Sequence, residues 1–356
     1  MGDLNPFIVP SASSVRELLN CVDRNGKGIA LVVGGEGELL ATVTDGDIRR
    51  AILGGITPAS PVSALLENRL CLGASKAITA FVETPKNELI QCMRKNGLRH
   101  LPLVDKKGQL IDLMILSDIQ PEKKLPVTCV IMAGGNGLRL RPLTKDIPKP
   151  MLTIGEYPLL QRIIEHLGRS GIQKIVIAVH YLADKIIDYF GDGHAFGVQI
   201  EYLKEELPLG TAGALSLVDA SSDFLLVMNG DILTNVNLES LVAFHIEQNA
   251  QLTIGLRLYD VGIPYGVVRL EGPNVKKLTE KPLMRYFVNG GIYLLNPDLK
   301  RYLVEGAPCD MTDFANLLIS KNQTVVGFPI QEYWMDIGQW ENYQKAQQDV
   351  SLGDVL

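Results

Sequence analysis

Apolar and amphipathic stretches alternate along most of the chain, and this pattern predicts strands and helices in turn. The apolar, β-branched run at residues 127–132 lacks polar alternation, which is typical of a central strand that is covered on both faces. The same reasoning predicts strands at 174–179, 199–203 and 224–228, and helices at 158–170, 183–190 and 238–249. Such an alternation predicts a doubly wound α/β sheet, whose ligands bind at the carboxyl ends of its strands.

The first third of the chain contains an internal repeat. Gly37 and Gly108 are 71 positions apart, and so are Asp47 and Asp118. The matching apolar runs, each interrupted by a glycine turn, are 28–33 with 39–48 and 100–104 with 110–119. Each repeat is therefore predicted to consist of a helix, a strand, a turn, a strand and a helix.

A short polar segment separates the repeat from the strand at 127–132. Residues 121–126 (PEKKLP) are charged and bounded by prolines, as is typical of a linker between domains. We therefore expect one domain at 1–120, a linker at 121–126 and a second domain at 127–356.

Composition restricts the class of protein. The 356 residues are 46% hydrophobic and 21% charged, an ordinary globular composition. No apolar run is long enough to span a bilayer, so we expect a soluble, cytoplasmic protein without a membrane partner. A net charge of −6 argues against a nucleic-acid partner. Five widely spaced cysteines indicate neither a zinc site nor a disulfide framework.

A glycine-rich, basic loop follows the strand at 127–132. Gly134, Gly135 and Gly137 can bring backbone N–H groups close to an anion, and Arg139 and Lys149 add positive charge. The loop lacks the Gly-Lys-Ser/Thr of a Walker loop and the third glycine of a dinucleotide-binding loop. A lone Gly-x-Gly after a strand is more often a tight turn, so these residues by themselves favour a turn and only allow a polyphosphate site.

The longer string Gly-Gly-x-Gly-x-Arg-Leu-x-Pro-Leu-Thr, followed by Pro-Lys-Pro, closely resembles the signature of the sugar-1-phosphate nucleotidyltransferases. The resemblance implies a Rossmann-like, glycosyltransferase-A-like domain. It also implies that the loop glycines bind the nucleotide phosphates and that Arg139 and Lys149 are catalytic. Leu138 stands where many members carry threonine, so we expect altered but retained activity.

Two aspartates match the metal site of that family. Asp231 follows the strand at 224–228 in the family's Gly-Asp element, and Asp336 lies in Trp-Met-Asp-Ile-Gly. The resemblance implies that both hold Mg²⁺, which prefers oxygen ligands and keeps several waters. Considered alone, an aspartate after a strand is more often a cap or a turn residue.

Further elements match the substrate side of the family's pocket. Glu280 and Lys281, in Glu-Lys-Pro, and Asn289 on the following strand are implied to bind the sugar phosphate. Gly210 and Thr211, which open a predicted helix, are implied to contact the nucleotide. Each element could alone be a surface turn, but all occur in family order.

The repeat at 1–120 resembles a tandem pair of CBS domains, which sense adenosine nucleotides. The resemblance implies a regulatory purine nucleotide at Thr44, Asp47 and Asp118. The second repeat has Ile115 where the first has Thr44, so only one half-site matches in full. A packing or dimerising module without a ligand is an equally open interpretation.

The whole layout resembles the CBS-fused guanylyltransferases. It implies transfer of a nucleoside monophosphate from a triphosphate, GTP first, to a hexose or amino-hexose 1-phosphate, with release of pyrophosphate. The NDP-sugar would serve cell-surface glycan or legionaminic acid synthesis, and the enzyme would be a homo-oligomer. A UTP- or dTTP-dependent enzyme is the close alternative, and an inactive nucleotide-sensing scaffold is a third.

Overall fold

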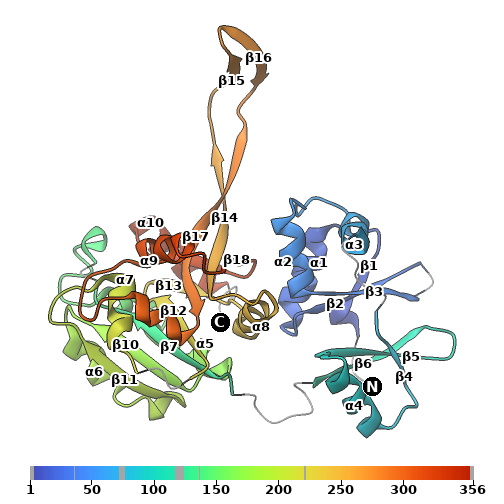
Figure 1. Cartoon of the computed structure of the whole chain (residues 1–356), viewed down its shortest axis with the longest axis horizontal. Helices are drawn as coiled ribbons and strands as arrows, with labels where there is room; N and C mark the ends of the chain where they lie inside the picture. The colour runs from blue at the N-terminus through green and yellow to red at the C-terminus, as the bar shows by residue number, and fades with distance from the viewer. Residues whose placement is uncertain are drawn as a thin grey trace. The chain divides into compact units, whose positions relative to one another are not determined.

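The computed structural model describes residues 4–35, 37–71, 77–116, 124–135, 137–219 and 222–352. The chain divides into two compact units. One consists of residues 1–125 with 237–240, and the other of residues 126–236 with 241–356 (Figure 1).

The first unit contains two small sheets with flanking helices. β1, β2 and β3 form one three-stranded sheet, and β4, β5 and β6 form the other. In chain order its elements are η1 (Asn5–Phe7), β1 (Ile8–Pro10), α1 (Val15–Asn25), β2 (Ile29–Val33), β3 (Leu39–Thr44), α2 (Asp45–Leu53), α3 (Val62–Cys71), β4 (Ala80–Phe81), α4 (Lys86–Lys95), β5 (His100–Val104) and β6 (Leu110–Ile115).

Strand pairing confirms the internal repeat and its offset. Ile29 pairs with Thr44 in the first sheet, and His100 pairs with Ile115, each 71 positions later, in the second. Both hairpins carry a register shift at the equivalent place, between Val32 and Val33 and between Leu103 and Val104. The sequence pattern did not predict the short parallel edge strands β1 and β4, because two or three residues are too few to show a period.

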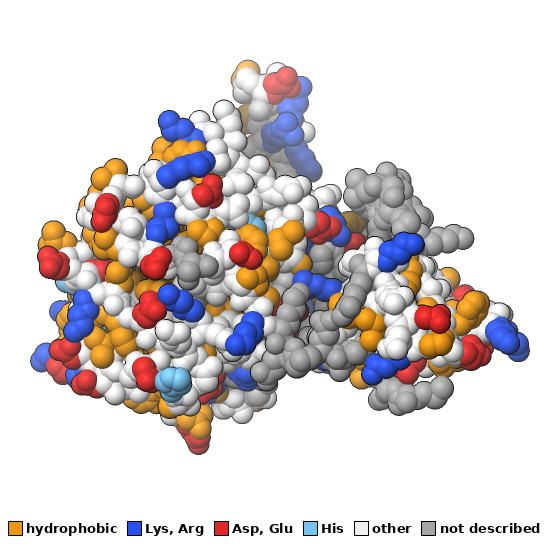
Figure 2. Space-filling model, turned by 60° about the horizontal axis from the view of Figure 1, so that its bottom comes forward, with side chains coloured by type: hydrophobic (Ala, Val, Ile, Leu, Met, Phe, Trp, Pro, Cys, Tyr) orange, Lys and Arg blue, Asp and Glu red, His pale blue; other side chains and the backbone are white. Residues whose placement is uncertain are grey.

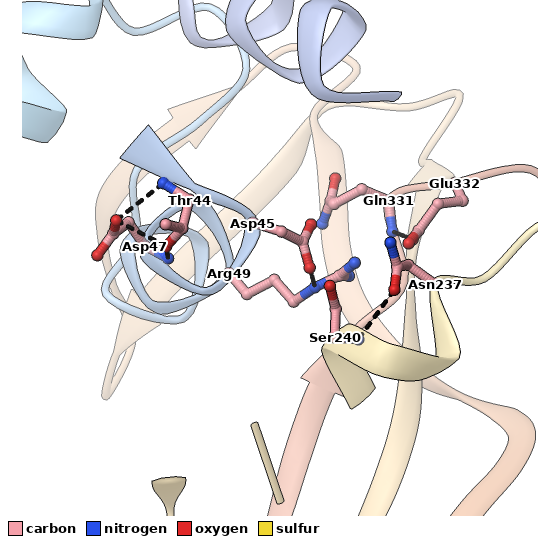
Figure 3. Close-up of polar contacts among 8 residues, drawn as sticks. All are labelled: Thr44, Asp45, Asp47, Arg49, Asn237, Ser240, Gln331 and Glu332. Carbon is pink, nitrogen blue, oxygen red and sulfur yellow. Dashed lines mark hydrogen bonds and ion pairs between the residues drawn. The ribbon is translucent and has the colours of Figure 1, made fainter. Parts of the chain in front are cut away.

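Helix capping sets where the first unit's helices begin. Ser14 caps α1 and Thr44 caps α2, and in both cases the third helical residue is an acid whose side chain returns to the cap. Figure 3 shows the Thr44 and Asp47 side chains pointing toward each other at the start of α2, and an Asp45–Arg49 pair within the same helix. Arg49 is fully buried, and its Nε lies 2.6 Å from Asp45 Oδ2.

The second unit contains a seven-stranded sheet with helices on its faces. Its helices are α5 (Leu159–Arg169), α6 (Ala183–Phe190), α7 (Gly210–Gly213), α8 (Leu238–Glu247), α9 (Met311–Ser320) and α10 (Trp340–Ser351), with the 3₁₀ turns η3 (Leu138–Leu140), η4 (Lys149–Met151), η5 (His194–Phe196), η6 (Ala214–Leu217) and η7 (Pro297–Tyr302). Its strands are β7 (Val127–Met132), β8 (Thr153–Ile154), β9 (Tyr157–Pro158), β10 (Lys174–Val179), β11 (Gln199–Lys204), β12 (Phe224–Asn229), β13 (Ile232–Thr234), β14 (Leu252–Gly262), β15 (Val267–Glu271), β16 (Asn274–Thr279), β17 (Leu283–Leu295), β18 (Val325–Pro329) and β19 (Trp334–Asp336).

The seven strands are ordered β11-β10-β7-β12-β17-β14-β18. The four strands β11, β10, β7 and β12 run parallel, as the alternation of strands and helices predicts. β17 runs antiparallel to β12 and β14, so the sheet is mixed and not fully parallel. The α/β fold class is confirmed. The reversed direction of β17 was not predicted, because the chain from β14 to β17 turns back through hairpins and has no helix between its strands.

The core of the second unit lies on both faces of this sheet. Every residue of β7 except Met132 is buried, which explains its apolar run without alternation. On one side α5 buries five aliphatic side chains at helical spacing, namely Leu159, Leu160, Ile163, Ile164 and Leu167. The carboxyl ends of β7 and β12, where the predicted site residues lie, are therefore held by a rigid sheet.

β14 and β17 extend beyond the sheet as a two-stranded ribbon, and β15 and β16 form a hairpin at its far end (Figure 1). We call residues 257–288 the arm. The sequence pattern did not predict it. In each of its strands, apolar and polar residues alternate over only five or six positions. That pattern does not distinguish a projecting hairpin from a strand of the main sheet.

Candidate active site

The glycine-rich loop leaves the carboxyl end of β7, as predicted. A Cβ atom at Gly134 would come within 3.0 Å of Glu205 Oε2 and 3.3 Å of His180 Cβ, so a side chain there would be crowded. Gly137 has φ +59° and precedes η3, which carries Arg139. Gly135 is exposed, and a Cβ atom there would meet no atom within 4 Å, so its backbone is open to a ligand.

Lys149 lies on η4 and pairs with Asp231, 82 positions later in the chain. Its Nζ donates to Asp231 Oδ2, and both side chains are only partly exposed. A Cβ atom at Gly137 would lie 3.2 Å from Lys149 Cβ. The fold therefore brings Gly137 of the glycine-rich loop, Lys149 and the first predicted metal ligand together.

Strand pairing brings Asp336 to the same place. β13 follows Asp231 directly and pairs antiparallel with β19, with Ile232 opposite Asp336. The Ile337 backbone N–H also donates to the Asp231 carbonyl oxygen at 2.9 Å. The two aspartates, distant in sequence, are thus fixed beside each other by backbone hydrogen bonds.

The Asp336 carboxylate lies in an unfavourable position for a lone charge. Its Oδ1 atom is buried and has no hydrogen-bond partner in the structure. Burial raises the pKa of Asp336, the negative charge of Asp231 raises that pKa further, and Lys149 and Arg139 oppose both effects. Gly338 leaves room for this carboxylate, because a Cβ atom there would lie 3.0 Å from Asp336 Oδ1.

A cation between the aspartates would relieve this arrangement. Two carboxylates supply the oxygen ligands that Mg²⁺ prefers, and the unpartnered Asp336 oxygen is available for one coordination bond. No group of three or more His, Cys, Asp or Glu suited to a metal occurs in the part of the chain that the structure describes. A metal held here by two carboxylates would therefore keep sites for water or phosphate oxygens.

Asn289 lies at the edge of this site. Its Nδ2 donates to the Tyr293 hydroxyl at 2.6 Å, and its Oδ1 accepts from the Gly291 N–H at 3.0 Å. The next residue in the chain, Gly290, accepts a hydrogen bond from the Trp334 indole on the strand that carries Asp336. The 289–291 segment is therefore joined to β19, the strand that carries Asp336.

Gly210 and Thr211 are engaged within the fold. Gly210 has φ +72°, and a Cβ atom there would lie 2.6 Å from the Cys309 carbonyl oxygen. The Thr211 hydroxyl accepts from the Met311 N–H at 2.9 Å at the start of α9. The predicted helix is only one turn of α-helix followed by η6, and these contacts fix where it begins.

The structure does not bring Glu280 and Lys281 to the aspartates. Both are exposed and lie on the arm, between β16 and the outer end of β17. The ladder runs six residues from the Leu256–Asn289 pair to the Gly262–Leu283 pair, a length of about 20 Å. Within one chain, Glu280 and Lys281 therefore lie far from Asn289.

The predicted regulatory residues are only partly described. Thr44 and Asp47 form the cap of α2, with the Thr44 N–H and hydroxyl donating to Asp47 Oδ2 at 2.9 and 2.8 Å. Arg50 donates to the other Asp47 oxygen at 2.9 Å. Asp118 lies outside the described residues. In the structure, Thr44 and Asp47 therefore cap the start of α2.

Two side chains near the site were not singled out from the sequence. Asn229 Oδ1 is buried without a partner, and its Nδ2 faces Gly291. Glu205 lies against Gly134, and burial raises the pKa of its carboxyl group. Asn229 could have been suspected, since it precedes Gly-Asp at the end of a buried strand. Glu205 had no sequence signal, because only the pairing of β10 with β11 places it there.

On the face drawn in Figure 2, Lys and Arg side chains are interspersed with Asp and Glu. Among the described residues, none of the helices is both long and apolar enough to cross a membrane.

Two known protein families match the chain. The nucleotidyl transferase family model matches residues 128–352, and the CBS domain model matches residues 1–54 and 73–120. The glycine-rich loop, Lys149 and both aspartates lie within the first match. Nucleotidyl transferases of this family typically use a divalent metal.

Curated relatives match the same part of the chain. A mannose-1-phosphate guanylyltransferase from Mycobacterium tuberculosis is 32% identical over 238 residues, 64% of this chain and 65% of the relative. A probable mannose-1-phosphate guanylyltransferase from Oryza sativa is 33% identical over 224 residues, 60% of this chain and 62% of the relative. The chain thus spans slightly less than two thirds of the length of these relatives.

Solved structures share the fold of the second unit. HddC from Yersinia pseudotuberculosis complexed with GMP-PN has a TM-score of 0.51 and 26% identity, over 63% of this chain and 99% of that chain. A Bacillus anthracis structure described as a putative glucose-1-phosphate thymidylyltransferase has a TM-score of 0.52 and 25% identity, over 62% of this chain and 94% of that one. Since one family model matches well over half of the chain, the chain belongs to the nucleotidyl transferase family, with CBS domains at its N-terminal end.

Proposed function

We propose that the chain is a sugar-1-phosphate nucleotidyltransferase that joins a nucleoside monophosphate from GTP to a hexose or amino-hexose 1-phosphate and releases pyrophosphate. The observation that carries this proposal is the convergence of Lys149, Asp231 and the buried Asp336 oxygen beside a glycine-rich loop. This set can neutralise two polyanions and hold a divalent cation at one point.

The reaction needs positioning and charge neutralisation more than a protein nucleophile. A sugar-phosphate oxygen attacks the α-phosphorus of the triphosphate, a P–O bond forms, and the bond to pyrophosphate breaks in line. The loop N–H groups at Gly134, Gly135 and Gly137, with Arg139, would hold the β- and γ-phosphates. Lys149 would contact the α-phosphate and the incoming sugar phosphate, where a compact ammonium suits a point contact.

Asp231 and Asp336 would hold Mg²⁺. Bound there, Mg²⁺ would offset negative charge on the α-phosphate and the attacking oxygen. In the structure Lys149 donates to Asp231. A bound phosphate could replace that contact, so Lys149 would be held in place before the substrates arrive.

Variants of this pair test the proposal. Lys149→Ala and Asp231→Asn should each lower kcat about 10²–10³-fold, as expected when a charge-stabilising group is lost. Lys174→Ala is the matched control, because Lys174 pairs with Glu201 on the same sheet in a similar way but at the β10–β11 edge. Pyrophosphate release is the readout. Near wild-type turnover in either site variant would overturn the assigned roles.

The choice of GTP rests on the relatives named mannose-1-phosphate guanylyltransferase and on the HddC complex with GMP-PN. The Bacillus anthracis structure favours dTTP as the alternative. A panel of GTP, UTP, dTTP and ATP, each with mannose, glucose and glucosamine 1-phosphate, separates them by pyrophosphate release. We expect the highest kcat/KM with GTP. A higher value with dTTP or UTP would contradict the guanylyl assignment, and no release with any pair would contradict the enzyme.

The product would be a GDP-sugar for cell-surface glycan or nonulosonic acid synthesis. This use of the product is inferred from the sequence resemblance alone.

We also propose that a purine nucleotide at Thr44, Asp47 and Asp118 of the CBS pair regulates the enzyme. Coupling of this kind is typically worth about 1–3 kcal/mol.

A further inference from the structure

Asn229 carries a buried oxygen atom without a donor. Among the residues that the structure describes, two buried side-chain oxygen or nitrogen atoms have no hydrogen-bond partner, namely Asn229 Oδ1 and Asp336 Oδ1. A buried acceptor that is left unpaired costs free energy, and native proteins contain few such groups. Both of these atoms belong to residues of the candidate active site, which suggests that each is paired when the substrates are bound.

The strand that carries Asn229 shows which way its side chain points. Asn229 is the last residue of β12, and side chains two positions apart on a strand share a face. Two positions earlier, Val227 packs in a core cluster with Tyr293 of β17 and Met311 of α9. The Asn229 side chain therefore continues this row, on the face of the sheet that α9 covers.

Gly291 leaves room for the Asn229 amide. It lies two positions before Tyr293 on β17 and has φ +68°. A Cβ atom at Gly291 would lie 2.8 Å from Asn229 Nδ2, so a side chain there would displace the amide. Because Nδ2 lies against Gly291, the Oδ1 atom on the other side of the amide points away from that glycine.

Other polar side chains lie on the same face. Asn289 Nδ2 donates to the Tyr293 hydroxyl at 2.6 Å, and the Thr211 N–H donates to Asp310 Oδ1 at 3.3 Å. Burial raises the pKa of Tyr293, and the negative charge of Asp310 raises that pKa further. Polar groups from β17, from α7 and from the start of α9 therefore gather on the face to which Asn229 points.

Two kinds of donor in the proposed reaction could satisfy Asn229 Oδ1. One is an O–H or N–H group of the sugar ring, and the other is a water molecule bound to Mg²⁺. Asn229 lies against Gly291, in the same segment as Asn289, which is proposed to bind the sugar phosphate. Asp231 and Asp336 are instead held together by the pairing of β13 with β19. The contact with Gly291 favours the sugar.

We propose that Asn229 is a specificity-determining residue whose Oδ1 atom accepts a hydrogen bond from one hydroxyl or amino group of the sugar ring. This inference rests on the proposed function, because it names a further residue that contacts the sugar of the sugar 1-phosphate. A sugar without that group would leave the buried Oδ1 unpaired in the complex. Asn229 would therefore select against such a sugar.

Deoxy analogues test the contact. The substrates are the preferred hexose or amino-hexose 1-phosphate and its 2-, 3-, 4- and 6-deoxy forms. In wild type, the analogue that lacks the donor should lose at least about tenfold in kcat/KM. In Asn229→Leu, which has no acceptor, the penalty for that analogue alone should disappear. Asn229→Asp keeps an acceptor and should keep the penalty. The same set of penalties in wild type and Asn229→Leu would refute the contact.

Stability without a ligand separates this role from a structural one. Asn229→Leu removes an unpaired acceptor and should raise the midpoint of thermal unfolding of the ligand-free chain. Asn296→Leu is the matched control, because Asn296 Oδ1 lies 3.1 Å from His245 Nε2, and this variant should lower the midpoint. A lower midpoint in Asn229→Leu would show that its amide stabilises the fold, and the proposal would fail.

Mg²⁺ tests the other kind of donor. The increase of the unfolding midpoint on adding Mg²⁺ should be the same in wild type and Asn229→Leu. A smaller increase in the variant would show that a metal-bound water is the donor, which overturns the sugar contact.

Binding measurements separate this proposal from the proposed function. If wild type shows no turnover with any triphosphate, the proposed function fails. Calorimetric titration of mannose, glucose and glucosamine 1-phosphate into wild type and Asn229→Leu then still tests the contact, because binding does not require turnover. We expect the Kd of the preferred sugar 1-phosphate to rise at least about tenfold in Asn229→Leu. An equal Kd in the two proteins would contradict the contact.

Discussion

At the scale of single residues, the burial of Asp336 conflicts with its charge. It is partly buried, one oxygen lacks a partner, and its nearest charged neighbours include the like charge of Asp231. This arrangement of the carboxylate lowers the stability of the fold, because an unpaired buried charge costs free energy. A cation bound between Asp231 and Asp336 would offset this cost.

Asp336→Asn should therefore stabilise the metal-free protein at pH 7. The raised pKa of Asp336 means that its ionised form costs folding free energy at pH values above that pKa, and the neutral amide removes this cost. We expect a higher midpoint of thermal unfolding in EDTA and a smaller increase of that midpoint on adding Mg²⁺. Asp184→Asn, on an exposed side chain, is the control. An unchanged Mg²⁺ response in Asp336→Asn would argue against the metal site.

His245 predicts how stability depends on pH. It is 1% exposed, its Nδ1 lies 2.8 Å from Thr253 Oγ1, and its Nε2 lies 3.1 Å from Asn296 Oδ1. Burial lowers the pKa of His245 below 6.5, and the Asn296 contact only partly opposes this. Because the folded state disfavours the imidazolium, stability is full above pH 6.5 and is lost as the pH falls below it.

His245→Gln should flatten that dependence. One buried histidine contributes at most about 1.4 kcal/mol per pH unit below its unfolded pKa. Urea unfolding between pH 7 and pH 5 measures the slope. His166, whose pKa is also lowered by burial, should account for a remaining slope of the same sign. His194→Gln, on an exposed residue, is the control. An equal slope in wild type and His245→Gln would contradict this assignment.

At the scale of elements, the two capping boxes of the first unit separate structure from ligand binding. Ser14 with Glu17 and Thr44 with Asp47 have almost the same geometry, with the cap hydroxyl donating to the acid at 2.8 Å in both. As helix caps, they should act alike. As a nucleotide site, only Thr44 and Asp47 should matter.

Glu17→Ala and Asp47→Ala should both lower the thermal midpoint of the first unit, because each removes one half of a capping box. If the CBS pair binds a purine nucleotide, only Asp47→Ala should weaken it. Calorimetric titration of AMP, ATP, GMP and GDP decides the question. No binding to wild type would leave the first unit as a packing or dimerising module, and equal binding to both variants would show that Asp47 is not part of the nucleotide site.

The sequence predicted the bounds of strands and helices well where the element is long and its hydrophobic pattern is periodic. β7, β10 and α6 begin and end where the pattern placed them. The turn at Gly210 was less predictable. Its residues have helical character, but contacts with Cys309 and Met311, about a hundred positions away, restrict it to one turn.

At the scale of the whole molecule, composition and motif order indicated two parts of different character, and family models match both. The repeat offset of 71 even gave the strand register of the second CBS domain from that of the first. The arm, by contrast, changes the meaning of the Glu-Lys-Pro element, because it places that element away from the rest of the site.

The sequence by itself determined the α/β class, the internal repeat and the identity of the charged residues, because these depend on local periodicity and on compound motifs. Tertiary structure decided which of those residues meet. The pairing of β13 with β19 joins two aspartates 105 positions apart (231 to 336), and the ribbon of β14 and β17 carries Glu280 and Lys281 outward. Strand pairing between distant segments depends on the packing of the whole unit, and no local pattern encodes it.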